Sequence, residues 1–208
     1  MFRSQILGTG SFLPERGITN HDLEALVETN DEWITTRTGI RQRRAVSEGQ
    51  ACSDLALGAS RQAIAAAGIE ASAVDMIIVG TVTSDMPFPS TAVLVARELG
   101  LTCCAFDLSA ACSGFMHALA MADNAVRTGM AKHPLVIGAE ALTTIVNWED
   151  RGTCILFGDG AGAVVLGAAE ADAERGLNPI FMHSNGSLAE ELCIPAGGSR
   201  TPLTPELL

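Results

Sequence analysis

The hydrophobic positions form short apolar runs separated by longer segments with helical spacing. Residues 76–80, 105–108 and 135–139 are short and largely apolar, as expected of strands buried on both faces of a sheet. Helical spacing occupies residues 90–99 and the segment from Cys112 to about Thr128, and a glycine follows each. Strands that alternate with helices in this way predict an α/β fold around a mostly parallel sheet.

The residues before this region predict one strand and three helices. Residues 3–10 end in Gly-Thr-Gly and are typical of a short strand that enters a turn. Threonine or asparagine caps begin two helices, at residues 19–27 and 30–39. An alanine-rich helix is predicted at residues 53–67, where a glycine follows it.

Two further apolar runs lie at residues 154–157 and 163–166, joined by the glycine-rich segment 158–162. A strand rather than a helix follows the glycines, so this segment does not match a dinucleotide-binding loop. We interpret it as the turn of an antiparallel hairpin added to the sheet, in which glycine allows the backbones to pack closely.

The hydrophobic pattern weakens after residue 170. One strand is predicted around residues 179–183, and the remaining stretch, rich in Gly, Pro, Ser and Thr, indicates loop. We therefore expect residues 1–170 to form the folded amino-terminal unit and residues 171–208 to be the truncated start of a further region.

Composition and charge narrow the class of protein. With 208 residues, 48% of them hydrophobic, the chain can bury the core of one domain or of half a larger one. The net charge of −11 argues against nucleic acid as the main partner. The chain shows no apolar run of about 18 residues, no basic and apolar start typical of a secretory signal, and six cysteines that fit reduced thiols. We therefore expect a cytoplasmic protein without a membrane segment.

Four arginines lie close together in the sequence, at Arg37, Arg41, Arg43 and Arg44. Such a cluster is compatible with a solvated surface. Bidentate guanidinium groups in an acidic protein would also suit a phosphate-bearing ligand. Charge alone leaves both interpretations open.

Cys112 is the strongest candidate for a catalytic group. A buried strand leads through the small residues 109–111 to this cysteine, which begins a long predicted helix. Unpaired backbone N–H groups and the helix dipole favour a thiolate there, and small neighbours admit an extended thioester. A buried structural cysteine is the alternative. The weaker candidates have neither metal-ligand spacing nor a redox partner, so no metal site is expected; they are Cys52, Cys103, Cys104, Cys154 and Cys193.

No histidine is a convincing base for this thiol. His117 lies five residues further along the predicted helix, which turns it by about 140° from Cys112. His183 falls in a predicted strand-to-turn region, whereas His21 and His133 are typical of surface positions.

Several ordered motifs resemble β-ketoacyl-acyl carrier protein synthase III, the condensing enzyme of bacterial type II fatty acid synthesis. They lie at residues 8–14, 31–41, 106–114, 150–152 and 157–163. The resemblance runs nearly continuously from residue 5 to about residue 195. It implies a thiolase-like fold, in which two similar α/β halves form an αβαβα layered architecture and this chain supplies the first half.

The resemblance also implies an activity. Such enzymes transfer an acyl group from acetyl-CoA, or another short acyl-CoA, to a cysteine and then condense it with malonyl-acyl carrier protein. Coenzyme A thioester is a substrate in this scheme, and no permanently bound cofactor is implied. A homodimer is expected as well.

Individual roles follow from the same resemblance. Cys112 matches the catalytic cysteine. The residues that match the coenzyme A site are Thr29, Trp33, Arg37 and Arg151, with the adenine between Trp33 and Arg151, where stacking and charge both favour a nucleotide. The residues that match the acyl pocket are Leu142, Phe157 and Phe88, of which Phe88 reaches into the partner subunit's pocket.

The chain departs from the family pattern where it ends. The family's catalytic histidine and asparagine belong to the second half, and this sequence stops at Leu208 before them. We therefore expect that these 208 residues alone do not condense acetyl-CoA with malonyl-acyl carrier protein. Trp148, shortly before Arg151, also departs from the pattern; its ring would either narrow the nucleotide entrance or pack on the surface.

Two alternative functions remain open. A related enzyme of the same fold, such as 3-hydroxy-3-methylglutaryl-CoA synthase or a secondary-metabolite ketosynthase III, is disfavoured by the motif around Trp33 and Arg37 and by the glycine segment. A non-catalytic scaffold that dimerises or binds acyl carrier protein is opposed by Cys112, because a scaffold needs no thiol at a helix N-terminus.

Overall fold

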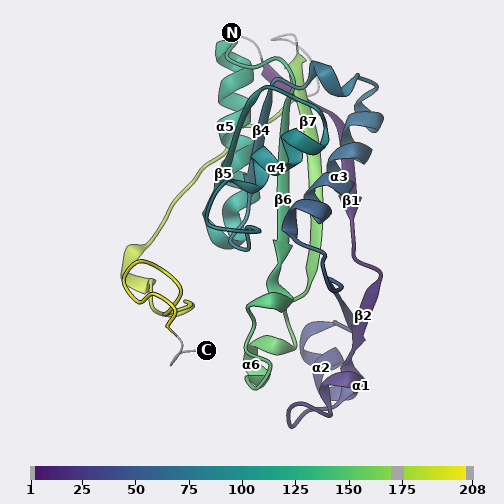
Figure 1. Ribbon diagram of the computed structural model, residues 1–208, viewed down its shortest axis with the longest axis vertical. Coiled ribbons are helices and arrows are strands. Elements are labelled where there is room, and N and C mark those ends of the chain that lie inside the picture. Colours follow the sequence, from purple (N-terminus) through teal and green to yellow (C-terminus); the bar gives the residue numbers. More distant parts are fainter. Residues whose placement is uncertain (1–2, 170–175, 205–208) are drawn as a thin grey trace.

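The computed structural model describes residues 3–169 and 176–204 (Figure 1). Its strands are β1 (Arg3–Phe12), β2 (Arg16–Thr19), β3 (Gln42–Ala45), β4 (Met76–Gly80), β5 (Cys104–Leu108), β6 (Pro134–Ala141) and β7 (Asp159–Ala169). Its α-helices are α1 (Asn20–Leu23), α2 (Asp31–Thr38), α3 (Cys52–Ala67), α4 (Thr91–Glu98), α5 (Gly114–Thr128) and α6 (Arg151–Cys154). Short 3-10 turns are η1 (Ala71–Ala73), η2 (Ala111–Ser113), η3 (Leu142–Thr144) and η4 (Gly186–Leu188).

One sheet organises the fold. Its strand order is β1-β7-β6-β4-β5, while β2 and β3 pair separately. Strands β6, β4 and β5 are parallel, whereas β7 runs antiparallel to both β6 and β1. The sheet predicted to be mostly parallel is therefore a mixed sheet, and the α/β class is confirmed.

Helices cover both faces of this sheet. Side chains alternate across a strand, so neighbouring residues enter different cores. Ile77 and Leu135 belong to the core beneath α3 and α4, whereas Ile78 and Val136 belong to the core beneath α5. The predicted helices at 53–67, 90–99 and 112–128 thus supply the two outer layers of an αβα unit (Figure 1).

Strand β1 lies unusually close to α3. A Cβ atom built on Gly10 would lie 2.2 Å from the backbone oxygen of Ala59, and one built on Gly8 would lie 2.2 Å from the backbone nitrogen of Ala67. The glycines of β1 and the alanines of α3 therefore allow backbone-to-backbone packing that larger side chains would prevent.

The predicted hairpin around residues 158–162 is wrong. Gly158 directly precedes the single long strand β7, and Gly160 and Gly162 lie at its start; the partners of β7 are β6 and β1. The preceding apolar run is not a strand, because Asp150 caps the short helix α6 and Ile155 packs in a separate cluster. The expected close backbone packing is found at Gly158, where a Cβ would lie 3.1 Å from the backbone oxygen of Arg44.

Three other segments differ from the predictions. The pair β2–β3 was not predicted, because its sequence is polar and lacks an apolar alternation. Helix α1 covers only Asn20–Leu23, and Leu26, which the longer helix would bury, is 55% exposed. No strand forms at residues 179–183: Ile180 packs against the core beneath α5, but Phe181 is 85% exposed and the segment pairs with no strand of the sheet.

The predicted division of the chain near residue 170 falls at residues 170–175, which lie outside the described residues. No helix in the described part of the chain is long and apolar enough to cross a membrane.

The contact between β1 and α3 leads to a stability prediction. Gly10→Ala places a methyl group against main-chain atoms that cannot move aside, so we expect a loss of about 3 kcal/mol in the free energy of unfolding. Gly162→Ala, on the neighbouring strand, is the control because nothing lies within 4 Å of its Cβ position. Chemical denaturation of both variants checks this; equal stabilities would contradict it.

Candidate active site

Three loops that carry predicted site residues leave the same edge of the sheet. Because β4, β5 and β6 are parallel, their carboxyl ends lie together, and such edges are where α/β proteins bind ligands. The loops contain Phe88, Cys112 and Leu142 respectively. The topology thus brings residues from distant parts of the chain to one edge.

The turn that carries Cys112 is strained and exposed. After β5, Ala111 adopts a φ of +45°, which L-residues other than glycine rarely occupy and which costs about 1–3 kcal/mol. Ala111 is the first residue of the turn η2, and α5 begins at Gly114, two residues later than predicted. The Cys112 side chain is exposed to solvent at this point. An exposed thiol on a strained strand-to-helix turn is accessible to an incoming thioester.

The position of this turn is set by glycines at the strand ends. A Cβ atom on Gly80, the last residue of β4, would lie 2.7 Å from the carbonyl carbon of Gly114. On β6, a Cβ on Gly138 would lie 3.2 Å from the Cβ of Phe115. The first turn of α5 therefore lies directly on the sheet, and Cys112 is held close to the carboxyl ends of the strands.

The other cysteines divide by environment. Cys52 and Cys154 are buried, and burial raises the pKa of both thiols, that of Cys52 to about 11. These two fit the structural role expected for them. Cys104 and Cys193 are exposed but lie on other parts of the chain. Within the described residues, no group of three or more His, Cys, Asp and Glu side chains could hold a metal ion.

His117 is engaged with its own helix. Its Nδ1 lies 2.9 Å from the backbone oxygen of Ser113, one turn earlier. This contact agrees with the expectation that His117 does not serve Cys112 as a base.

Glu140, at the end of β6, anchors the loop that leads to Phe88. Its carboxylate accepts hydrogen bonds from the Val82 backbone N–H at 2.9 Å and from the hydroxyls of Thr83 at 2.6 Å and Thr81 at 3.4 Å. Burial raises the pKa of Glu140, and these hydrogen bonds oppose the shift. The spacing of the sequence offered no signal for this role, because the partners lie about sixty residues away.

Two aspartates hold the rest of the same loop. Asp85 accepts bonds from the backbone and hydroxyl of Ser53, at 2.9 and 2.7 Å. Asp107 accepts from the backbone N–H groups of Thr91 and Ala92, at 2.7 and 2.8 Å. Between these anchors Phe88 projects from the chain and is 83% exposed.

A cavity of about 450 Å³ lies between this loop and the turn that precedes Cys112. Its walls include Val82 and Pro87 from the loop, and Phe106 and Ser109 from β5 and the following turn.

Asp159 performs a similar anchoring role for the Leu142 turn. It is only 5% exposed and accepts from the Thr143 backbone at 2.8 Å, from the Thr143 hydroxyl at 2.5 Å and from the Val46 backbone at 2.7 Å. Leu142 is half-buried in this turn, and Phe157 is half-buried just before β7.

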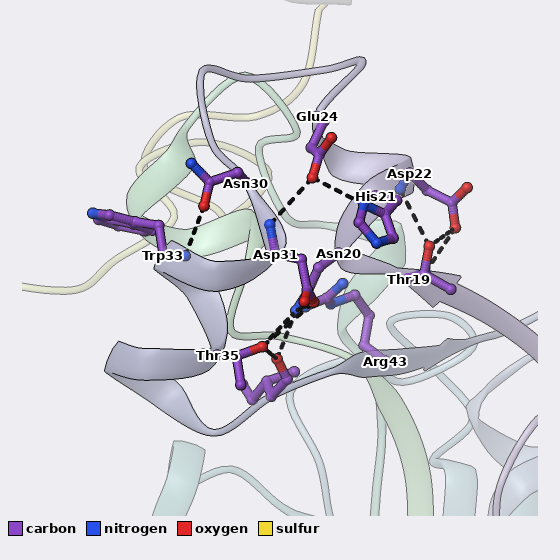
Figure 2. Close-up of polar contacts among 11 residues, drawn as sticks. Thr19, Asn20, His21, Asp22, Glu24, Asn30, Asp31, Trp33, Thr35 and Arg43 are labelled. Carbon is purple, nitrogen blue, oxygen red and sulfur yellow. Dashed lines mark hydrogen bonds and ion pairs between the residues drawn. The ribbon is translucent and has the colours of Figure 1, made fainter.

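The structure also brings together three residues expected to bind a nucleotide. The guanidinium carbons of Arg37 and Arg151 lie 4.8 and 4.7 Å from the centroid of the Trp33 ring. Arg151 Nη1 donates to the backbone oxygen of Glu28 at 3.1 Å. Beside it, the buried Thr29 Oγ1 has no hydrogen-bond partner among the described residues. Trp33 projects from α2, whose first turn is capped by Asn30, as Figure 2 shows.

The four clustered arginines have different environments. Arg37 lies over Trp33 and Arg41 is exposed. Arg43 is buried, and Arg44 donates to the backbone oxygens of Pro14 and Glu15 at 3.2 and 2.9 Å. The four arginines therefore share neither a solvent-exposed surface nor one phosphate-binding cluster.

Trp148 is half-buried and packs against the cluster of Leu23, Ile34, Cys154 and Ile155. Trp33 packs against the same cluster, so Trp148 is not simply a surface residue.

Comparison with known proteins agrees with this geometry. The family described as 3-oxoacyl-[acyl-carrier-protein] synthase III matches residues 106–186, which include the Cys112 turn. The β-ketoacyl-[acyl-carrier-protein] synthase III of Caldanaerobacter subterraneus subsp. tengcongensis is 54% identical over 202 residues, covering 97% of this chain and 60% of the relative. That of Xanthomonas campestris pv. campestris is 54% identical over 197 residues, covering 94% and 60%.

A solved structure shows the same fold. The crystal structure of 3-oxoacyl-(acyl carrier protein) synthase III from Pseudomonas aeruginosa matches with a TM-score of 0.89 and 40% identity, covering 96% of this chain and 62% of that one. The chain thus spans about three fifths of the length of these relatives.

The environment of Glu140 leads to a pH prediction. Burial raises the pKa of this carboxyl above its ordinary value of 4.5, so the folded protein retains the proton to higher pH than the unfolded chain does. The stabilising contribution is fully present below pH 4.5 and is lost as the pH rises through the raised pKa. In the Glu140→Gln variant the side chain is an amide, which does not ionise in this pH range.

We therefore expect the stability of the wild type relative to Glu140→Gln to decrease as the pH rises from 4 to 7. Chemical denaturation across this range measures the difference. A difference that is constant, or that grows with pH, would show that the carboxyl is not held in the protonated form by burial.

Proposed function

Because the chain belongs to the β-ketoacyl-[acyl-carrier-protein] synthase III family, whose amino-terminal part it matches, we propose that the whole protein condenses a short acyl-CoA with malonyl-acyl carrier protein. The observation that carries the proposal is the exposed Cys112 on its strained turn at the carboxyl edge of β5. The matched family region includes this turn.

The chemistry proceeds through an acyl-cysteine. The Cys112 thiolate attacks the thioester carbonyl carbon and the bond from that carbon to the coenzyme A sulfur breaks. Coenzyme A leaves as a thiolate that takes up a proton from solvent, and the acyl group is now bound to the Cys112 sulfur. Malonyl-acyl carrier protein then loses CO₂, and its carbanion attacks the acyl carbonyl. A carbon–carbon bond forms, the bond to the Cys112 sulfur breaks, and the thiolate is regenerated. The coenzyme A thioester is thus a substrate, coenzyme A is a product, and no permanently bound cofactor takes part in this proposal.

Trp33, Arg37, Arg151 and Thr29 form the proposed coenzyme A site. The Trp33 ring provides a stacking face for adenine, and the guanidinium groups suit its phosphates. The 4.7 Å separation of Arg151 from Trp33 leaves no room for a ring between them, so adenine would enter there only as Arg151 moves away. The unpartnered Thr29 hydroxyl follows Glu28, whose backbone oxygen accepts from Arg151, and would be a further polar contact for the ligand.

The proposed acyl pocket requires two subunits. Leu142 and Phe157 would line it from one subunit, whereas Phe88, 83% exposed, would extend into the pocket of the partner in a homodimer. We further propose that the protein acts in the cytoplasm, and that residues 1–170 form the first half of its thiolase-like fold with a further region from residue 171.

Acylation of the complete protein tests this function. After incubation with acetyl-CoA, intact-mass analysis should show one added acetyl group, located by peptide mapping at Cys112. Cys112→Ala should lose both the adduct and the ketoacyl product formed with malonyl-acyl carrier protein, because no other thiol occupies this turn. Cys104→Ala, which removes another exposed thiol, is the matched control and should keep both.

An unmodified Cys112 in the folded complete protein would favour a scaffold instead. A requirement for acetoacetyl-CoA would indicate the related synthase of the same fold.

A further inference from the structure

Arg43 is a buried arginine whose interactions join the segments that carry the proposed nucleotide site. It lies on β3 and is only 5% exposed. Burial lowers the pKa of its guanidinium, and no ion pair among the described residues includes it. A buried charge without a carboxylate partner is costly, so its hydrogen bonds must compensate.

The guanidinium donates to three different segments of the chain. Nη1 donates to the backbone oxygen of Ile18 at 3.1 Å, and Nη2 donates to Asn20 Oδ1 at 2.8 Å and to the backbone oxygen of Ile155 at 3.1 Å. Ile18 lies on β2, Asn20 begins α1, and Ile155 directly follows α6. One planar group therefore ties together parts of the chain more than a hundred residues apart.

Asn20 extends this connection to α2. Its side chain is completely buried, and its Nδ2 donates to Asp31 Oδ1 and to the backbone oxygen of Ile40, each at 2.8 Å. These acceptors bracket α2, which runs from Asp31 to Thr38. Figure 2 shows Asn20 between Arg43 and this helix.

The two ends of this network carry the proposed ligand contacts. Helix α2 carries Trp33 and Arg37, whereas α6 carries Arg151. The guanidinium groups of both arginines lie against the Trp33 ring.

Helix α6 is only four residues long and α2 eight, and the two share one small apolar cluster, in which Ile34 and Cys154 are fully buried. Apolar packing is not directional, so we infer that the hydrogen bonds of Arg43 and Asn20 fix how the two helices are oriented within this cluster.

We propose that Arg43 is a positioning residue for the coenzyme A nucleotide: without touching the ligand, it sets Trp33 and Arg37 against Arg151. This inference rests on the proposed function, because it assumes that these three side chains bind coenzyme A. Lysine cannot replace arginine fully here, since a single ammonium group cannot reach three acceptors arranged around a planar fork.

The test uses the complete protein and compares an acyl donor that contains the coenzyme A nucleotide with one that lacks it. Arg43→Met retains an unbranched side chain in the buried position but lacks the donors. The control is Arg16→Met, which removes an exposed arginine from the same strand pair, where Arg16 lies opposite Ala45. Calorimetry measures the Kd for coenzyme A, and mass spectrometry measures acylation of Cys112 by acetyl-CoA and by the acetyl thioester of N-acetylcysteamine, which has no nucleotide.

We expect Arg43→Met to raise the Kd for coenzyme A, and to slow acylation by low concentrations of acetyl-CoA, by about tenfold or more. Acylation by the nucleotide-free thioester should stay within about twofold of the wild-type rate, because the Cys112 turn lies on other elements. Arg16→Met should match the wild type in each measurement. If Arg43→Met does not fold, Arg43→Lys carries the comparison and should show a smaller effect with the same selectivity.

Equal loss with both thioesters, or an unchanged Kd for coenzyme A, would overturn the positioning role. A wild type that binds coenzyme A but forms no ketoacyl product would contradict the proposed condensing function, while a higher Kd in Arg43→Met would still support the positioning role.

Discussion

The first turn of α5 lies in backbone contact with the end of β4, and the remainder of the candidate site is arranged around this contact. No side chain fits between Gly80 and Gly114, and small residues such as Ala118 and Ala122 continue the close approach along the helix. Close packing on both sides leaves the connecting turn little freedom, so the left-handed backbone of Ala111 is maintained by its surroundings. The packing of α5 on the sheet thus sets the position of the proposed nucleophile.

The site is built on loops, yet the loops are anchored by buried or half-buried polar groups. Glu140 and Asp159 each accept three hydrogen bonds, and in each case one donor is a backbone N–H of the loop that the carboxylate holds. Bonds to a carboxylate are stronger than those between neutral groups, so a few of them can order a connection that lacks regular structure. Arg43 plays the complementary part for α2 and α6, as a donor to backbone oxygens and to Asn20.

Hydrophobic periodicity predicted the helices and strands in which buried residues recur at regular intervals. Strands β4 and β6 and helices α3, α4 and α5 appeared close to their observed bounds, because each buries a regular face in one of the two cores. The apolar run at residues 154–157 led to a wrong strand prediction, since Cys154 and Ile155 pack against the distant Leu23 and Ile34 rather than in a sheet. Strand β3 was not predicted because one of its two buried residues is Arg43, a residue type that is normally exposed.

The sequence by itself determined the family, the α/β class and the candidate nucleophile, because the Cys112 turn and its flanking strand and helix are continuous in the chain. The opposed roles of the clustered arginines were decided only by tertiary structure: Arg37 lies on Trp33, whereas Arg43 is buried among carbonyl oxygens. The same holds for Glu140, whose partners come from another strand end. The physical reason is that a polar side chain's role depends on which groups surround it once buried, and those groups are supplied by distant segments.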